Sequence, residues 1–322
     1  MGRRPPAAVP EMVRRKVEAL GPAGQEWLRD LEATLGRLEL AWSVVIGPPL
    51  EGGSAAYVAL AQGADGRQAV CKVAMPDGLA GNSPFEQELR AIELAQGGLG
   101  YVELLAVSPD RRAILLERLG RPLSALGLSA ERQIEVITAT VSQGWRSAPD
   151  GLVMRDGATQ ARWLAEFIVT TWEELSRPCP EALVDLARQF AAHRASSVRA
   201  HPVVIHGDAH PDNVLEDPDR PGLFKLIDPD AMVSDPAHEL GIVLRDWSEE
   251  LLARDPLTTG QAWCRATAAE IGALSQAVWE WAYLERMSTG LFMAQLGLGR
   301  GRSLLEVAAR WAEAPRITPS AP

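Results

Sequence analysis

The chain has 322 residues, of which 47% are hydrophobic, and a formal net charge of −10 at neutral pH. This length accommodates about two domains with substantial cores, and no apolar run reaches the ~20 residues of a membrane helix. An acidic chain lacks the basic surface that nucleic-acid phosphates require, so we expect neither a nucleic-acid nor a membrane partner, whereas a cationic small substrate is compatible with the charge.

The three cysteines, Cys71, Cys179 and Cys264, lie far apart and form no CxxC pair. An odd number at such spacing disfavours both a disulfide framework and a metal site, so we expect a reducing, cytoplasmic environment. Residues 1–10 are basic and proline-rich but lack the apolar segment of a secretory signal, and we expect a frayed tail there.

The first third of the chain is expected to contain two helices and a small sheet. Helical spacing covers residues 11–20 and 24–35. Short β-type runs then follow at residues 41–46, 55–61, 68–73, 102–107 and 113–117. A helix interrupts them after the third strand, because Ser83-Pro84-Phe85-Glu86 has the cap, the proline and the acid of a helix start.

From about residue 129 the pattern is helical, except for a strand–loop–strand segment at residues 203–228. Helices are expected at residues 130–143, 159–175, 180–193, 236–253 and 261–296. Gly272 and Gly290 favour a broken pair of helices in the last of these segments. We therefore expect an N-terminal domain at residues 1–117 and a mainly helical C-terminal domain at residues 118–322.

One segment of the chain indicates chemistry, the eight residues from His206 to Asn213 with sequence HGDAHPDN. A second acid, Asp228, follows at the end of a strand. Asp208 is spaced to accept the proton of an attacking hydroxyl group. Asn213 and Asp228 supply hard oxygen ligands that can hold Mg²⁺ on nucleotide phosphates, as kinase-type phosphoryl transfer requires.

This HGDxxxxN pattern, followed by an Ile-Asp strand end, resembles the aminoglycoside phosphotransferase superfamily, which shares the kinase fold with choline and homoserine kinases. The matching blocks, in the order of that family, are residues 70–73, 85–89 and 113–119. Four further blocks resemble the branch that contains aminoglycoside 6-phosphotransferases (streptomycin kinases) and hydroxyurea phosphotransferases: residues 227–230, 234–240, 24–28 and 38–42. The resemblance covers about residues 20–310.

The resemblance implies an α+β, bilobal, protein-kinase-like fold. Its small N-terminal lobe, residues 1–117 in this chain, is a five-stranded antiparallel sheet with one inserted helix and binds the nucleotide. Its larger C-terminal lobe, residues 118–322, is mainly helical and carries the catalytic loop and the substrate pocket. In that fold Lys72, at a strand end, reaches the α- and β-phosphates of ATP and needs an orienting carboxylate. We expect Glu88 in that role, because Glu86 faces about 160° away around the helix.

Two further segments are expected to contact the nucleotide. Small residues between the first two strands, Gly52, Gly53 and Ser54, allow backbone amides to approach phosphate closely. The stretch from Glu117 to Leu119 is the expected hinge, whose backbone hydrogen-bonds the adenine edge.

The remaining polar residues of the motif region have structural explanations. We expect His206 and His210 to shape the catalytic loop. Asp230 completes the metal site or bonds to its own turn. Asp235 is an N-cap before a proline, and the resemblance allows it to brace the catalytic loop as well.

The motif region also favours a small-molecule kinase over a protein kinase. Protein kinases that are switched by phosphorylation place an arginine directly before the catalytic aspartate, where this chain has Gly207. Only six residues separate Asp228 from Asp235, so a peptide-docking activation segment is missing. We expect a constitutively active enzyme.

The substrate is less constrained by the sequence. The C-terminal region has acids near tryptophans: Asp246, Glu249, Glu250, Glu280 and Glu285 near Trp247, Trp279 and Trp281. They suit a polyamine or guanidinium ligand, or equally form a solvated acidic face over a tryptophan core.

The expected activity is transfer of the γ-phosphoryl group of Mg-ATP to a small-molecule hydroxyl. The leading acceptor class is an antibiotic, either aminoglycoside or streptomycin-like or of the hydroxyurea type. The alternatives are a metabolic kinase for an amino alcohol or sugar, and a nucleotide-binding regulator without turnover.

Overall fold

The structure is a computed structural model that describes residues 9–50, 56–76, 83–95, 100–197 and 202–317. Its contacts divide the chain into two compact units. The N-terminal unit comprises Met1–Gln96 and Tyr101–Gly120, and the C-terminal unit comprises Gly97–Gly100 and Arg121–Pro322.

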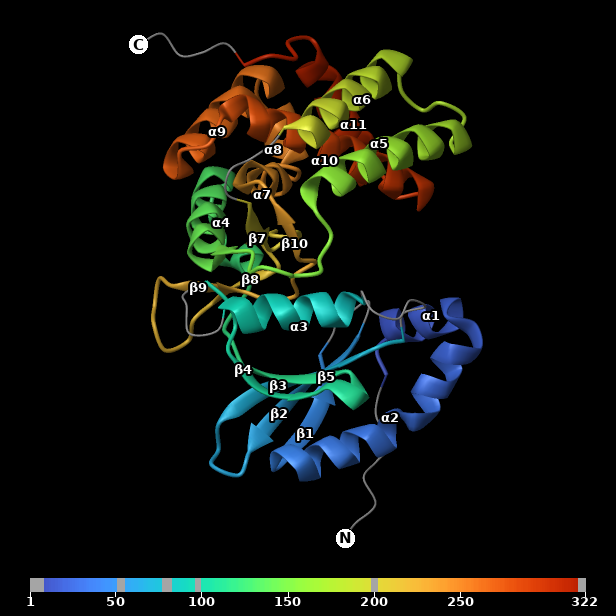
Figure 1. Ribbon diagram of the computed structural model, residues 1–322, viewed down its shortest axis with the longest axis vertical. Coiled ribbons are helices and arrows are strands. Elements are labelled where there is room, and N and C mark those ends of the chain that lie inside the picture. Colours follow the sequence, from blue (N-terminus) through green and yellow to red (C-terminus); the bar gives the residue numbers. More distant parts are fainter. Residues whose placement is uncertain (1–8, 51–55, 77–82, 96–99, 198–201, 318–322) are drawn as a thin grey trace. The chain divides into compact units, whose positions relative to one another are not determined.

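The N-terminal unit is built on one antiparallel sheet in the order β1-β2-β3-β5-β4 (Figure 1). The strands are β1 (Val44–Pro49), β2 (Ala56–Gly63), β3 (Gln68–Ala74), β4 (Leu104–Ser108) and β5 (Ala113–Glu117). The helices are α1 (Glu11–Ala19), α2 (Gly21–Trp42), α3 (Pro84–Ala95) and the short 3₁₀ turn η1 (Pro109–Arg111). This is the five-stranded sheet with one inserted helix that the sequence predicts.

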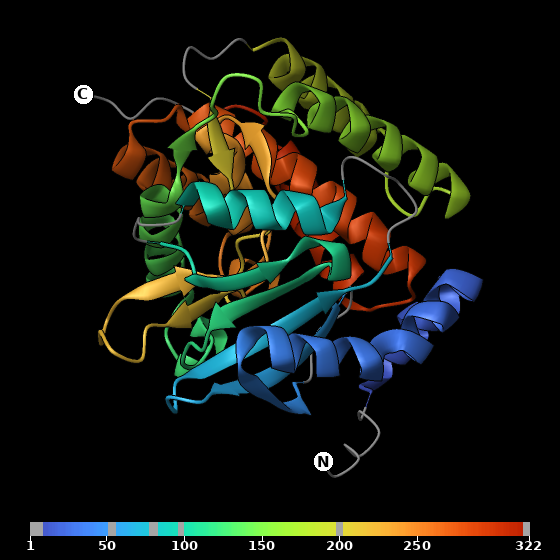
Figure 2. The same cartoon turned by 60° about the horizontal axis from the view of Figure 1, so that its bottom comes forward.

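Helices cover both faces of this sheet (Figure 2). Helix α2 buries Leu31, Leu35 and Leu38 against one face, where Cys71 and Val73 of β3 belong to the same core. Alternate residues of a strand point to opposite faces, so Lys72 lies on the face that α3 covers.

The strand expected from residue 41 begins instead at Val44, because α2 is longer than its sequence pattern indicates. Leu38 continues the buried stripe of α2, which keeps the next turn helical. The helix then ends at Ser43, whose backbone is left-handed with φ 54°.

The C-terminal unit is mainly helical. Its helices are η2 (Leu123–Leu126), α4 (Ala130–Gly144), α5 (Gly157–Glu174), α6 (Glu181–Ser196), α7 (Pro236–Val243), α8 (Ser248–Leu252), α9 (Pro256–Ile271), α10 (Ser275–Gln295) and α11 (Arg300–Ala312). Its strands are β6 (Arg146–Ser147), β7 (Val203–Ile205), β8 (Val214–Glu216), β9 (Phe224–Leu226) and β10 (Met232–Ser234).

Helix α10 is the centre of this unit and packs against α5, α6, α7, α9 and α11. It is buried on nearly all sides, and its Trp279 stacks on Trp311 of α11 with ring centroids 4.2 Å apart. None of the helices in the described part of the chain is long and apolar enough to cross a membrane.

Three positions decide where the helices of this unit break. The helix expected at residues 236–253 is split into α7 and α8, because Trp247 has a left-handed backbone with φ 69°. The expected break at Gly272 is present, with φ 67° at the end of α9. Gly290 does not break α10; it provides room for close packing against Leu305.

Candidate active site

The N-terminal unit contains a buried Lys–Glu ion pair. Lys72 lies in β3, between Val58 of β2 and Ile114 of β5. Its Nζ is 2.6 Å from Oε1 of Glu88 on α3, and both side chains are largely buried. Glu86 instead forms a capping box at the start of α3: its amide donates to Ser83 Oγ, and its carboxylate accepts from the amide of Ser83. The pairing expected from the helix geometry is therefore present.

The expected hinge, from Glu117 to Leu119, begins at the last residue of strand β5. Glu117 ends β5; its amide donates to the Glu103 carbonyl at 3.0 Å, and its carboxylate accepts from the Glu103 amide at 2.7 Å. Leu119 is buried two residues further on. Gly52, Gly53 and Ser54 lie outside the described residues.

In the C-terminal unit, the loop that is expected to carry the catalytic base begins at the end of β7, which pairs with β10. Gly207 has φ +81°, and a Cβ atom at this position would lie 2.1 Å from the carbonyl oxygen of Asp230. Only glycine fits this backbone and this contact. That close approach explains why the residue before Asp208 has no side chain.

Glu239 of α7 binds the backbone at the start of this loop. This fully buried carboxylate accepts hydrogen bonds from the backbone amides of His206 at 2.5 Å and Gly207 at 3.1 Å. Burial raises the pKa of Glu239 to about 7, against the two amide hydrogen bonds, which lower it. The sequence pattern does not single out Glu239, since an acid in the first turn of a helix has a sufficient explanation in the helix dipole.

His206 is a buried structural residue of the same loop. Its Nε2 lies 2.9 Å from the Ile227 carbonyl, and its Nδ1 accepts from the Asp208 amide at 3.2 Å. Burial lowers its pKa, so the ring is neutral, with Nε2 as the donor. His206 therefore shapes the loop, as expected from the sequence.

Asp208 sits between two basic side chains. Arg245, just beyond the end of α7, donates from Nη2 to Asp208 Oδ1 at 3.1 Å, and His210 Nε2 is 3.5 Å from Oδ2. Burial alone would raise the pKa of Asp208, but the hydrogen bond from His210 and the charge of Arg245 hold it well below its usual range. The carboxylate remains 39% exposed and is ionised at neutral pH.

Asn213 and Asp228 are brought together by a hairpin. Asn213 directly precedes β8 and Asp228 follows β9, and these strands pair with Val214 opposite Leu226. The Asn213 side-chain nitrogen donates to the Asp208 carbonyl at 3.0 Å, which turns the amide oxygen away from that contact. Asp228 is exposed and has a left-handed backbone with φ 58°.

This donor set suits a metal that is completed by other ligands. Within the described ranges, no three His, Cys, Asp or Glu side chains converge as a metal site. One carboxylate and one amide oxygen are too few for a site built from protein alone. They match Mg²⁺, which usually takes one or two protein oxygens plus phosphate and water.

Other acids of this region serve the structure. Asp230 forms an ion pair with Arg155 at 2.5 Å. Asp235 caps α7 and accepts from the Ala237 amide at 2.7 Å, as its position before a proline indicates.

A cavity of about 940 Å³ lies next to Asp208 in the C-terminal unit. Its lining includes five carboxylates and two arginines: Asp208, Asp212, Asp246, Glu249 and Glu250, with Arg245 and Arg300. Trp247, Phe292 and Met293 supply apolar surface. Of the acids and tryptophans expected to form a substrate pocket, Asp246, Glu249, Glu250 and Trp247 line this cavity.

The other members of that set lie in the core. Glu280 is buried and pairs with Arg194 at 2.6 Å, and Glu285 lies 3.1 Å from the buried His238. Trp279 and Trp281 are fully buried. The tryptophan core is therefore present, but Glu280 and Glu285 are buried and paired with basic side chains, so they do not form the solvated acidic face of that interpretation.

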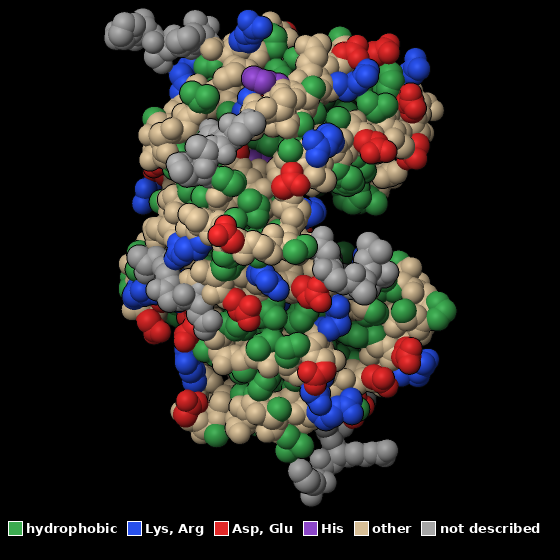
Figure 3. Space-filling model, in the orientation of Figure 1, with side chains coloured by type: hydrophobic (Ala, Val, Ile, Leu, Met, Phe, Trp, Pro, Cys, Tyr) green, Lys and Arg blue, Asp and Glu red, His purple; other side chains and the backbone are tan. Residues whose placement is uncertain are grey.

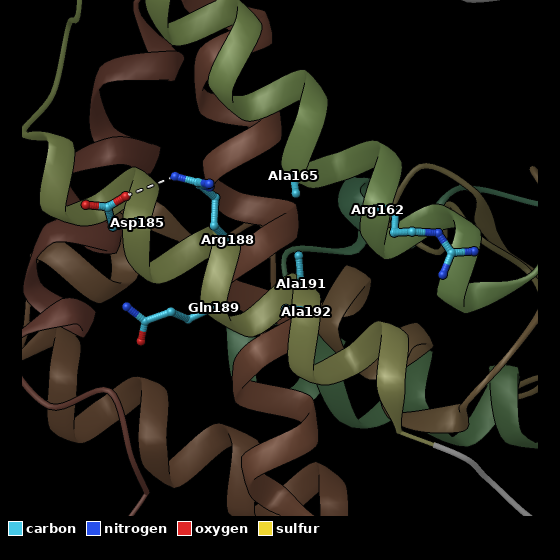
Figure 4. Close-up of a pocket in the computed structure, with 7 residues that line it drawn as sticks. All are labelled: Arg162, Ala165, Asp185, Arg188, Gln189, Ala191 and Ala192. Carbon is cyan, nitrogen blue, oxygen red and sulfur yellow. Dashed lines mark ion pairs between the residues drawn. The ribbon is translucent and has the colours of Figure 1, made fainter.

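A second hollow, of about 610 Å³, lies on the surface between α5 and α6 (Figure 4). Alanines form much of its lining, and Arg188 is directed toward Asp185 at 3.5 Å. Acidic and basic side chains are interspersed on the face of the molecule that Figure 3 shows. None of the residues expected to act in catalysis lines this hollow, so the cavity at Asp208 is the candidate acceptor site.

The sheet with its Lys–Glu pair, and the loop that carries Asp208 and Asn213 ahead of Asp228, define a kinase-like protein. Comparison with known sequences agrees with this class. The chain belongs to the family described as "Phosphotransferase enzyme family", whose sequence pattern matches residues 48–274.

Two relatives are similar over about 70% of the chain. A hydroxyurea phosphotransferase from Kitasatospora aureofaciens is 29% identical over 241 residues, which cover 71% of this chain and 65% of the relative. A streptomycin 6-kinase from Streptomyces griseus is 26% identical over 224 residues, which cover 68% of each protein. The chain thus spans about two thirds of the length of these relatives.

Solved structures share the fold at low identity. A choline kinase from Cryptosporidium parvum has a TM-score of 0.58 and 9% identity, covering 88% of this chain and 95% of that one. An amicoumacin kinase in complex with AMP-PNP, Ca²⁺ and Ami has a TM-score of 0.57 and 12% identity, covering 90% and 97%.

Proposed function

We propose that this protein transfers the γ-phosphoryl group of ATP to a hydroxyl group of a cationic small molecule, with an aminocyclitol antibiotic as the leading acceptor class. The observation that carries the proposal is Asp208, an ionised and partly exposed carboxylate at the wall of an acidic cavity. A general base must be ionised and within reach of its acceptor, and Asp208 meets the first condition across the neutral pH range.

Each proposed role follows from the local surroundings. Asp208 takes the proton of the acceptor hydroxyl group. The oxygen of that hydroxyl group bonds to the γ-phosphorus, and ADP leaves. Lys72, held by Glu88, binds the α- and β-phosphates. Asn213 and Asp228 would hold Mg²⁺, which neutralises charge on the phosphate oxygens. The amicoumacin kinase complex with AMP-PNP, an ATP analogue, supports ATP as the donor.

The glycine-rich segment and the hinge complete the proposed nucleotide contacts. Backbone amides of Gly52, Gly53 and Ser54 would cover the phosphates, and backbone atoms from Glu117 to Leu119 would meet adenine. The Glu117 amide is already bonded to Glu103, so Leu119 is the better amide donor of the two. The need for ATP, and the three free cysteines, support a cytoplasmic location.

The size and charge of the cavity favour an aminocyclitol over hydroxyurea. A volume of about 940 Å³ lies at the upper end of the range for drug-sized ligands, about 300–1,000 Å³. Hydroxyurea is far too small to fill it, whereas a multi-ring aminoglycoside is not. Arg245 and Arg300 each pair with one carboxylate, which leaves Asp212, Glu249 and Glu250 as the acidic surplus.

A metabolic amino-alcohol kinase is the second candidate. The fold similarity to a choline kinase favours it, because a small cationic alcohol would also suit an acidic wall. The two candidates differ in acceptor size, which a direct assay resolves.

The deciding experiment measures ATP-dependent ADP release with streptomycin, another aminoglycoside, hydroxyurea, choline and a neutral sugar as acceptors. We expect aminocyclitols to be the best acceptors, with the Asp208→Asn variant as the catalytic control. A preference for choline or for a neutral sugar would favour the metabolic kinase. ATP binding without turnover on any acceptor would favour a nucleotide-binding regulator.

A further inference from the structure

Arg300 occupies an unfavourable position for a cation. It is the first residue of α11, whose N-cap, Gly299, provides no side-chain cap and whose first turn contains no acid. The start of a helix carries a partial positive charge, so a guanidinium is disfavoured there. Arg300 is also repelled by the buried guanidinium of Arg286. An attractive partner nearby would offset this cost.

That attraction comes from Asp246. Arg300 Nη2 lies 2.6 Å from Asp246 Oδ1. The two partners differ in exposure: the Asp246 side chain is 15% exposed and the Arg300 side chain 57%. The anion is therefore sheltered in the wall of the cavity, while the cation extends over it from the solvent side.

The backbone on both sides of this pair is rigid. Arg286 donates at 2.8 Å to the carbonyls of Leu244 and Asp246, which holds the turn that carries Asp246. On α11, a Cβ atom at Gly301 would lie 2.6 Å from the Gly290 carbonyl, so the start of this helix is packed tightly against α10. The exposed Arg300 side chain can therefore move while the backbone on both sides stays in place.

Both residues line the cavity that contains Asp208. We propose that Arg300 is an internal substitute for the cationic group of the acceptor, bound to Asp246 until an ammonium or guanidinium group displaces it. This inference rests on the proposed phosphoryl transfer to a cationic acceptor. Displacement exchanges one ion pair for another, and the pair that is broken is a weak one because its cation is exposed and opposed by the helix dipole.

The exchange makes the site selective. A neutral hydroxyl compound has no charge to offer Asp246 and must compete with Arg300 for the same space. Specificity is a difference of affinities, and here the protein's own arginine lowers the affinity for the wrong class of acceptor. Asp246 is accordingly the residue that recognises the cation, and Arg300 sets how strongly the cation must bind.

The test uses Arg300→Gln with Arg302→Gln as the matched control. Arg302 is also basic, exposed and in the first turn of α11, but it does not line the cavity. We expect Arg300→Gln to lower the KM for streptomycin by about 2- to 5-fold, the range of an exposed ion pair. Arg302→Gln should leave it unchanged, and Asp246→Asn should raise it.

A double variant separates a local effect from a structural one. If Arg300 acts only through Asp246, Arg300→Gln has no effect on the streptomycin KM in the Asp246→Asn background. An unchanged or raised KM in the single Arg300→Gln variant overturns the inference, as does an equal decrease in Arg302→Gln.

Binding of streptomycin, measured by calorimetry, distinguishes this inference from the proposed function. Tighter binding to Arg300→Gln than to the wild type, without phosphate transfer by either, supports the displacement and refutes the kinase activity on this acceptor. Phosphate transfer with equal affinities refutes the displacement alone. No binding of streptomycin to either protein overturns the inference.

Discussion

Replacing Glu239 by glutamine tests how the buried carboxylate supports the loop that carries Asp208. In the wild type, its two oxygens accept from the amides of His206 and Gly207. In Glu239→Gln, one oxygen becomes an NH₂ group, which cannot accept, whereas the hydroxyl oxygen of the protonated wild-type side chain keeps its acceptor capacity. One of the two amides is then left without an acceptor. A buried unsatisfied amide costs about 1–3 kcal/mol, so the free energy of unfolding should fall by that amount at pH values where the wild-type side chain is protonated.

The raised pKa of Glu239 determines how the destabilisation by Glu239→Gln changes with pH. Burial raises the pKa of Glu239 from 4.5 to about 7. A raised pKa in the folded state contributes stability that is complete below the unfolded value and is lost as the pH rises through the folded value. Between about pH 4.5 and pH 7 the wild type therefore loses roughly 3 kcal/mol that the glutamine variant keeps. The cost of the substitution should be largest near pH 5 and should approach zero, or reverse, by pH 8.

Urea unfolding followed by tryptophan fluorescence at pH 5 and pH 8 measures both quantities. Glu306→Gln, an exposed carboxylate on α11, is the matched control and should stay within about 0.5 kcal/mol of the wild type at both pH values. A cost for Glu239→Gln that is equal at the two pH values, or larger at pH 8, refutes the reasoning.

Three further predictions concern the proposed kinase activity. Asp208→Asn should lower turnover by roughly 10²–10⁴ while ATP binding is retained, and near-normal initial rates would remove Asp208 from the role of base. Asp228→Asn should abolish Mg²⁺-dependent turnover; asparagine is chosen because it tolerates the left-handed backbone at this position. Asn213→Ala should reduce turnover less. Unchanged Mg-ATP affinity in Asp228→Asn contradicts the assignment of Asp228 as a Mg²⁺ ligand. The KM for a cationic acceptor should rise with ionic strength, because partly exposed charges are screened over about 8–10 Å at 0.1–0.15 M. A salt-independent KM would favour a neutral acceptor.

The sequence predicts the elements that depend on local pattern. The five strands and the inserted helix follow from their periodicity and punctuation, and the choice of Glu88 over Glu86 follows from helix geometry. The break at Gly272 has a direct backbone cause. These features are visible because the interacting residues are close in sequence or obey a regular spacing.

Residues that act across the fold leave no such pattern. Arg245 reaches Asp208 from 37 positions away, and Arg300 reaches Asp246 from 54 positions away. Arg286 of α10 donates to the carbonyls of Leu244 and Asp246 in the turn between α7 and α8, from about 40 positions away. From the sequence alone, an arginine in a helical segment is interpreted as a surface residue, because its partner in the folded structure is not known.

The N-terminal helices affect how the protein can be shortened. The family pattern begins at residue 48, after α1 and α2. A chain cut at that boundary would lose the leucines of α2 that cover the apolar face of the sheet. It would also lose Trp27, whose indole donates to the Ala74 carbonyl at 3.0 Å, two residues beyond Lys72. Such a shortened protein should aggregate through the uncovered face, and it should lose support for the strand that carries Lys72.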